Sequence, residues 1–136
     1  MNNKIFLIGM MGAGKTTIGL ELSKIKQVPF LDIDQIINAS DYIVKNSIED
    51  FRDREKSEIK KIHSDKKCII VSIGGGAILS KENRMIIKQN YSIYLQASTK
   101  KLISRIKNQD SFRPLIQNEY NGDIDINLFK NLFHER

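Results

Sequence analysis

The feature that most constrains the fold is a glycine-rich segment near the amino end of the chain. The segment Gly9-Met10-Met11-Gly12-Ala13-Gly14-Lys15-Thr16 matches the pattern GxxxxGK[ST] in full. It directly follows the apolar run of residues 5–8 and directly precedes a helical pattern, as a loop between a buried strand and a helix does. Glycines allow successive backbone N–H groups of such a loop to surround the oxygen atoms of an anion. The sequence therefore predicts a strand, a phosphate-binding loop and a helix, in that order.

The side chains of this loop suit a nucleotide. Lys15 places a positive charge over the β and γ phosphates, Thr16 offers a hydroxyl to Mg²⁺, and the following helix directs the positive end of its dipole at the anion. The alternative is an ordinary glycine-rich turn, but the flanking strand and helix patterns favour a nucleoside triphosphate site. The residues expected to bind the nucleotide are Gly12, Ala13, Gly14, Lys15, Thr16 and Thr17.

Length and composition limit the number of domains and the class of protein. A chain of 136 residues with 40% hydrophobic residues supports a single domain, residues 1–136, with one core. The one cysteine, Cys68, lies in an apolar, strand-like run, so we expect neither a disulfide framework nor a cysteine-rich metal site. We find no signal peptide and no apolar run of about 18 residues, the length of a membrane span. We expect a cytoplasmic protein that binds no membrane.

The net charge of +6 allows several kinds of anionic partner. However, the lysines occur in scattered pairs and are not interleaved with aromatic residues, as a surface that stacks nucleic-acid bases requires. The sequence favours solvated helix faces over a nucleic-acid interface.

Apolar runs and helical patterns alternate along the chain. Strands are predicted at residues 5–8, from 30, at 68–71 and at 91–95. Helices are predicted after the phosphate loop with Ile18, Leu22 and Ile25 as the buried stripe, at residues 48–63, after the cap Ser80 to residue 88, and after the cap Ser98. This alternation predicts a parallel sheet flanked by helices.

Residues 108–123 interrupt the alternation, since they are polar and have no period. Long loops in a compact domain are commonly lids or binding loops. Arg113 lies in this loop, and an arginine there can stabilise the phosphates of a bound nucleotide. A loop arginine without a function is the alternative.

Asp32 and Asp34 end the second predicted strand, and residues two apart in a strand project to the same side. Ligands of open parallel sheets bind at the carboxyl ends of the strands, so both carboxylates are expected to face the phosphates. One can orient the waters of Mg²⁺ and the other can accept a proton from a hydroxyl. The alternative is that the two aspartates cap a helix.

The predicted helix 48–63 places Glu55 in its apolar stripe, where a carboxylate needs a partner. Arg52, three residues earlier, can supply it and would then hold a rigid guanidinium toward a substrate. A plain surface ion pair explains the spacing equally well.

The segment Gly74-Gly75-Gly76 ends the third predicted strand. Bare backbone there allows a ligand to pack closely, although a flexible turn is an equal alternative.

Taken together, these residues resemble the shikimate kinase family of P-loop kinases. The resemblance rests on the phosphate loop through Thr17, Asp32-Ile33-Asp34, Phe51-Arg52 with Glu55, Gly74-Gly75-Gly76, Arg113-Pro114-Leu115 and Arg136. It implies an α/β, three-layer P-loop NTPase fold with strand order 2-3-1-4, in which the fifth edge strand of the family has no counterpart. The chain departs from the family at Ser47 and Ile48, where a Gly-Glu pair is usual.

The resemblance implies transfer of the γ-phosphoryl group of ATP to the 3-hydroxyl of shikimate by a monomer. Asp34 is then the base, Lys15 and Arg113 stabilise the transferring group, and Thr16 with Asp32 holds Mg²⁺. Shikimate contacts are implied for Asp34, Arg52, Gly74, Gly75, Gly76 and Arg136, within a substrate-binding segment of about residues 33–62 and beyond it. Arg105 is implied to lie against the adenine.

Two alternatives stay open at this point. A P-loop kinase for gluconate or a nucleoside monophosphate shares the phosphate loop but gives no reason for Arg52, Glu55 and the triple glycine. A non-catalytic nucleotide-binding module is the second alternative.

Overall fold

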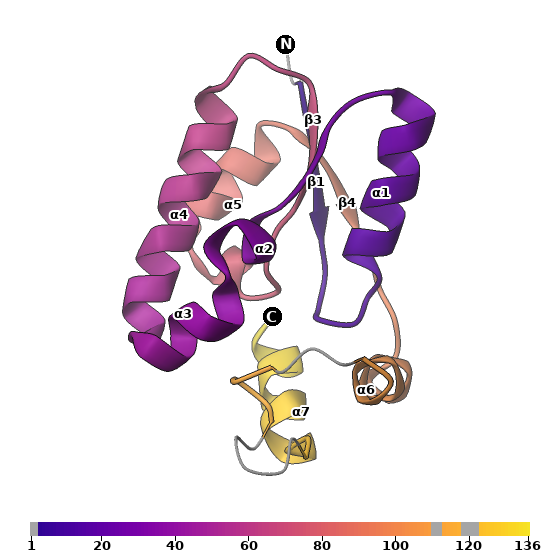
Figure 1. Ribbon diagram of the computed structural model, residues 1–136, viewed down its shortest axis with the longest axis vertical. Helices are drawn as coiled ribbons and strands as arrows, with labels where there is room; N and C mark the ends of the chain where they lie inside the picture. The colour runs from indigo at the N-terminus through magenta and orange to yellow at the C-terminus, as the bar shows by residue number, and fades with distance from the viewer. Residues whose placement is uncertain (1–2, 110–112, 118–122) are drawn as a thin grey trace.

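The computed structural model describes residues 3–109, 113–117 and 123–136, which form a parallel sheet with helices on both faces (Figure 1). The strands are β1 (Lys4–Ile8), β2 (Phe30–Asp32), β3 (Ile69–Ser72) and β4 (Tyr91–Tyr94). The helices are α1 (Lys15–Lys26), α2 (Ile33–Ile37), α3 (Ala39–Lys45), α4 (Ile48–Ser64), α5 (Lys81–Lys88), α6 (Thr99–Lys107) and α7 (Ile126–Glu135), with a 3₁₀ helix at Ala77–Leu79.

The strand order is β2-β3-β1-β4 and every neighbouring pair is parallel, which confirms the predicted fold class. Helix α1 covers one face of the sheet, and α4 and α5 cover the other (Figure 1). Because all strands run in one direction, the segments that follow β1, β2 and β3 meet at one edge of the sheet. That edge is where ligands bind in open α/β sheets.

Apolar side chains form two cores, so the expectation of one core is wrong. The larger one includes Phe6, Ile59 and Val71 and joins the sheet to α2, α4 and α5. The smaller one includes Ile106 and Phe129 and packs α6 and α7 against the phosphate loop. Figure 1 shows α6 and α7 beyond the carboxyl ends of the strands. The last residues of the chain, after α7, point back toward the sheet. The second core thus holds two helices beside the edge where ligands bind.

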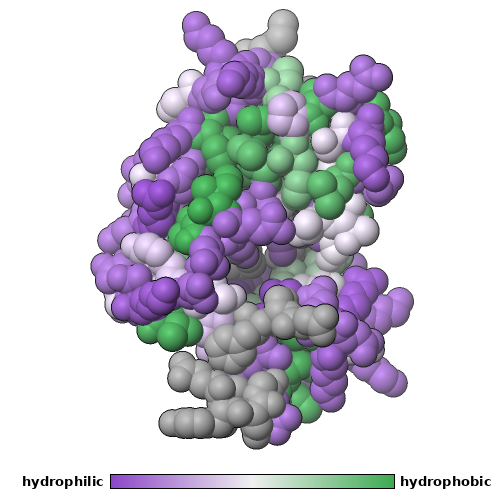
Figure 2. Space-filling model, viewed as in Figure 1, coloured by the Kyte–Doolittle hydropathy of each residue, from purple (hydrophilic) through white to green (hydrophobic). Residues whose placement is uncertain are grey.

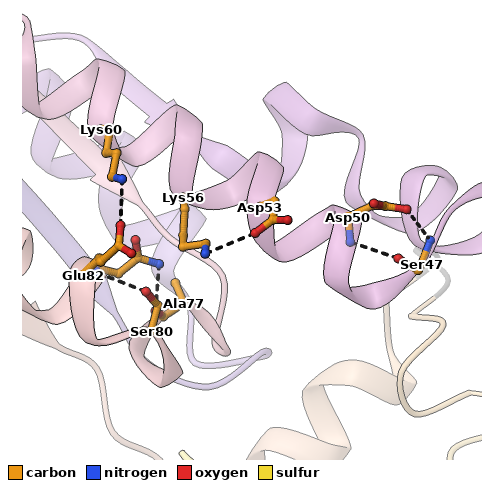
Figure 3. Close-up of polar contacts among 9 residues, drawn as sticks. Ser47, Asp50, Asp53, Lys56, Lys60, Ala77, Ser80 and Glu82 are labelled. Carbon is orange, nitrogen blue, oxygen red and sulfur yellow. Dashed lines mark hydrogen bonds and ion pairs between the residues drawn. The ribbon is translucent and has the colours of Figure 1, made fainter.

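Helix α4 is fixed at both its start and its middle. Ser47 caps its first turn by accepting a hydrogen bond from the backbone N–H of Asp50 at 3.0 Å, while the Asp50 carboxylate accepts one from the Ser47 N–H (Figure 3). Lys60 pairs with Glu82 of α5 at 2.7 Å (Figure 3). The expected stripe of this helix is largely confirmed, since Glu55 is fully buried within it.

The predicted buried stripe of α1 is wrong at Ile18 and Ile25, while its third residue, Leu22, is half-buried. Ile18 and Ile25 are 42% and 75% exposed, whereas Gly19 is buried. A Cβ on Gly19 would overlap the ring of Phe30, so the helix approaches the sheet through its glycine and the contact face is rotated away from the isoleucines. Pattern alone weights large apolar residues and misses a contact that depends on a small one.

Other boundaries also differ from the expectation. Cys68 is exposed and precedes β3, because the strand begins one residue later than predicted. All four residues of β4 are exposed, and β4 is an edge strand within the described part of the chain.

No helix in the described ranges is long and apolar enough to cross a membrane.

Candidate active site

A cavity of about 470 Å³ lies at the carboxyl ends of β1, β2 and β3, and Figure 2 shows a hollow between the body of the molecule and its lower part. Most of the residues predicted for the site line this cavity. They are Gly12, Gly14, Lys15, Thr16, Thr17, Asp32, Asp34, Arg52, Gly74, Gly75, Gly76, Arg113 and Arg136. Segments far apart in the sequence therefore meet in one place.

The phosphate loop is built around backbone geometry that favours glycine. Gly14, the N-cap of α1, has a φ of 94°, and nothing lies within 4 Å of the place where a Cβ would stand. The Nζ of Lys15 donates hydrogen bonds to the carbonyl oxygens of Gly9 at 2.7 Å and Met10 at 3.1 Å. Burial lowers the pKa of Lys15 to about 8, although Asp34 and Asp32 oppose this effect.

Asp32 links the helix that follows the phosphate loop to the backbone of Asp34. The Thr16 hydroxyl donates to Oδ2 of Asp32 at 2.7 Å, and Oδ1 of Asp32 accepts from the backbone N–H of Asp34 at 3.1 Å. Asp32 is therefore the N-cap of α2, and Asp34 lies in the first turn of that helix, not in the strand as predicted. The capping alternative holds for Asp32, yet both carboxylates still line the cavity.

The Thr16 and Asp32 oxygens fit Mg²⁺. Both are hard oxygen donors beside the phosphate loop, and the described residues contain no group of three or more His, Cys, Asp or Glu that could hold a metal ion. Mg²⁺ keeps several waters and takes further ligands from phosphates, so a single hydroxyl and a single carboxylate suffice from the protein.

Asp34, which is half-buried, and Glu55, which is fully buried, both lie against Gly74. A Cβ on this glycine would stand 2.7 Å from Oε2 of Glu55 and 2.9 Å from Oδ1 of Asp34. Burial raises the pKa of Asp34, and Asp32 adds to this effect, whereas Lys15, Arg52 and Arg113 oppose it. Burial and Asp32 thus favour the protonated form of Asp34, and the three cations favour its ionised form.

The ion pair between Arg52 and Glu55 is buried, which decides between the two interpretations of this spacing. Nη1 of Arg52 lies 2.8 Å from Oε1 of Glu55, with side chains 23% and 0% exposed. Burial raises the pKa of Glu55, while its pairing with Arg52 opposes that effect. Oε2 of Glu55 has no hydrogen-bond partner within the described residues. The guanidinium is therefore held rigidly at the cavity wall.

The triple glycine makes room for two guanidinium groups. A Cβ on Gly76 would overlap the Arg52 guanidinium and would stand 2.7 Å from Nη2 of Arg136. A Cβ on Gly75 would stand 3.3 Å from Nη1 of Arg136. This close approach, rather than flexibility, explains why glycines follow β3.

Arg136 is half-buried, and its guanidinium lacks a complete set of partners among the described residues. Its Nε has no acceptor in the described part of the chain, and burial together with the neighbouring Arg52 lowers its pKa. Glu135, Glu55 and Asp34 offset part of this effect on Arg136, and a bound anion would offset more of the repulsion between the two guanidinium groups.

Arg113 lines the same cavity as Asp32 and Asp34. Burial lowers the pKa of its guanidinium, and Asp34 and Asp32 oppose this effect. The predicted lid of residues 108–123 is described only in part, since residues 110–112 and 118–122 lie outside the described ranges.

Two predicted residues do not line the cavity. Ala13 is buried in the second core. Arg105 is exposed, and its Nη1 donates to the carbonyl oxygen of Gly12 at 3.2 Å, so it contacts the phosphate loop from α6. Its predicted place against an adenine is not tested by these contacts.

One wall of the cavity falls in the predicted substrate-binding segment, residues 33–62, but its two short helices were not expected. The helices α2 and α3, of 5 and 7 residues, were not predicted because segments so short carry little periodicity. The only local signal was a turn residue, Asn38, which has a φ of 55° at the junction of the two helices. The missed lining residues are Met11, Gln35, Asn38, Ala39, Ser40, Ile43, Phe51, Ser72, Gln109, Pro114 and Leu115.

A phosphate loop between β1 and α1, an acid pair after β2 and guanidinium groups lining the same cavity define a P-loop phosphotransferase. Comparison with known proteins narrows the class. The sequence model described as shikimate kinase matches residues 11–136, and the chain belongs to this family. Its activity is that of an ATP-dependent phosphotransferase, shikimate kinase.

Individual relatives of known sequence and structure are also shikimate kinases. The shikimate kinase of Flavobacterium psychrophilum is 37% identical over 96% of this chain and 80% of its own length. That of Dictyoglomus turgidum is 32% identical over 86% and 73%. The structure is similar to the shikimate kinase of Acinetobacter baumannii in complex with shikimate, with a TM-score of 0.82 and 32% identity over 96% of this chain and 74% of the other. A gluconokinase of Sinorhizobium meliloti, at a TM-score of 0.63 and 15% identity, shares the fold alone.

Proposed function

We propose that the cavity transfers the γ-phosphoryl group of ATP to the 3-hydroxyl of shikimate, with the residues assigned below. The observation that carries the proposal is the pair of guanidinium groups, Arg52 and Arg136, that converge on Gly76 in the same cavity as the phosphate loop. One end of the cavity thus suits phosphates, and the other suits a small acid.

The acceptor end suits the carboxylate of shikimate. Arg136 has an unpartnered Nε within the described residues and lies against a second cation, so a bound carboxylate would relieve their repulsion. Arg52 is held by Glu55 and therefore loses little freedom when it binds an anion. Gly74, Gly75 and Gly76 leave the wall bare, which allows a ring with several hydroxyls to approach the backbone.

Asp34 is the group that accepts the proton of the substrate hydroxyl. Its partial burial raises the pKa of its carboxyl, the direction that makes a carboxylate a stronger base. The neighbouring cations Lys15, Arg52 and Arg113 favour its ionised form and so oppose this rise of the pKa. Asp34 can therefore both orient the hydroxyl and take its proton.

The nucleotide end uses preorganised charge. ATP supplies the phosphoryl group, and Lys15 and Arg113 are placed to stabilise the negative charge that develops on its oxygens. Thr16 and Asp32 would hold Mg²⁺, with Thr17 and the loop N–H groups around the phosphates. Arg105 remains our proposed adenine contact, and we propose that the enzyme acts as a monomer with residues 33–62 as the main substrate-binding segment.

The test is a coupled assay of ADP release with shikimate, gluconate and nucleoside monophosphates run in parallel. We expect turnover with shikimate only, and no turnover with Lys15→Met, the matched inactive variant. Turnover with another acceptor instead of shikimate would overturn the assignment of the guanidinium pair. Silence with every acceptor, together with retained ATP binding, would indicate a binding module.

A further inference from the structure

The backbone of Arg113 is anchored to α7. Its carbonyl oxygen accepts hydrogen bonds from the N–H groups of Ile116 and Gln117, both at 3.0 Å. Ile116 is 1% exposed in the second core, and its carbonyl oxygen accepts from the N–H of Asp125, the N-cap of α7, at 2.7 Å. The start of the Arg113 side chain is therefore fixed relative to a packed helix.

Two glutamine side chains hold Arg113 from opposite directions in the sequence. Oε1 of Gln109 accepts a hydrogen bond from Nη2 of Arg113 at 2.5 Å, and Oε1 of Gln117 accepts one from its backbone N–H at 2.6 Å. Gln109 also lines the cavity. Within the described residues Arg113 forms no ion pair with a carboxylate, and its Nε has no acceptor.

Gln109 holds the guanidinium of Arg113 through an uncharged amide oxygen. A guanidinium has five N–H donors, and a neutral amide oxygen occupies one of them without cancelling the positive charge. A carboxylate at the same place would hold the side chain more strongly but would compete with phosphate oxygens for it. Preorganised charge lowers a barrier only when it need not reorganise during the reaction. Glutamine satisfies both needs, since it orients the group and leaves its charge available.

We propose that Gln109 is a positioning residue, which orients the Arg113 guanidinium toward the phosphoryl group, and that Gln117 supports it by fixing the Arg113 backbone. This inference rests on the proposed role of Arg113 and goes beyond it, because neither glutamine belongs to the motif that carries the family resemblance.

The test is a double-mutant cycle between residues 109 and 113, measured by steady-state kinetics with ATP and shikimate. We expect Gln109→Leu to lower kcat roughly three- to tenfold, the range of one hydrogen bond, with the KM for shikimate unchanged. In the Arg113→Ala background the same substitution is expected to have no further effect, because Gln109 acts through Arg113. Gln109→Glu is expected to lower kcat as well, although it keeps the side chain in place. Gln89→Leu, at the exposed end of α5, is the matched control.

The possible outcomes separate two failures. If Arg113→Ala leaves kcat unchanged, the proposed role of Arg113 is wrong and the positioning role falls with it. If Arg113→Ala is defective but Gln109→Leu keeps the kcat of the unmodified enzyme, only the positioning role is overturned. An equal loss from Gln109→Leu in both backgrounds would indicate a general structural effect and would also overturn it.

Discussion

Replacement of Lys15 by methionine should abolish turnover and at the same time make the folded protein more stable near neutral pH. Lys15 is charged at pH 7, yet burial lowers its pKa from 10.5 to about 8. The folded state therefore binds this proton less tightly than the unfolded chain does, and the difference corresponds to about 3 kcal/mol of lost stability. Methionine has a similar length and no charge to bury.

The expected gain is smaller than this limit. The side chain keeps some contact with the solvent of the cavity, and methionine cannot donate the two hydrogen bonds to Gly9 and Met10. We expect the free energy of unfolding of Lys15→Met to exceed that of the original protein by about 1 to 2 kcal/mol at pH 7. An active-site charge that costs stability is a common compromise in enzymes.

The free energy of unfolding should depend on pH because of Lys15. Between about pH 8 and 10.5 the unfolded chain holds the Lys15 proton while the folded protein releases it, so the stability of the original protein rises across this window. The advantage of Lys15→Met is therefore greatest below about pH 8 and shrinks toward pH 10.5.

The measurement is urea unfolding, followed by far-UV circular dichroism at pH 7 and pH 9.5 in the same salt. Lys24→Met is the control, because Lys24 lies on the same helix and its side chain is 71% exposed. The reasoning is refuted if Lys15→Met is no more stable than the original protein at pH 7, or if its advantage does not change with pH.

Three further outcomes are expected. Asp34→Asn should lower kcat at least about 100-fold, because the base is lost, while calorimetry shows nearly unchanged ATP affinity; an equal loss of both would place Asp34 in the nucleotide site. The kcat/KM for ATP should follow a bell-shaped pH profile, with an acid limb above the usual aspartate range since burial raises the pKa of Asp34, and an alkaline limb near pH 8 from Lys15. A profile flat from pH 7 to 9.5 would contradict the Lys15 assignment. Gly76→Ala should raise the KM for shikimate about tenfold or more by displacing Arg52 and Arg136, and an unchanged KM would exclude their contact with substrate.

The sequence by itself determined the parts that local chemistry decides. The phosphate loop is contiguous, so its glycines, Lys15 and Thr16 identify it without any knowledge of neighbours in space. Alternating apolar runs and helical patterns determined the parallel sheet, because those periods reflect the geometry of single strands and helices. The resemblance to a known family rested on the order of such segments.

Only the tertiary structure decided how those segments act on one another. Equal spacing fits a surface pair or a buried one, and the packing of α4 against the sheet makes Arg52 and Glu55 the buried kind. Gly76 and Arg136 lie far apart in the sequence, so nothing local reveals that one leaves room for the other. The same holds for the face of α1, which Gly19 sets by its contact with Phe30. Periodicity reports which residues share a face of an element, whereas distances between elements, burial and the resulting pKa shifts arise only when the chain is packed.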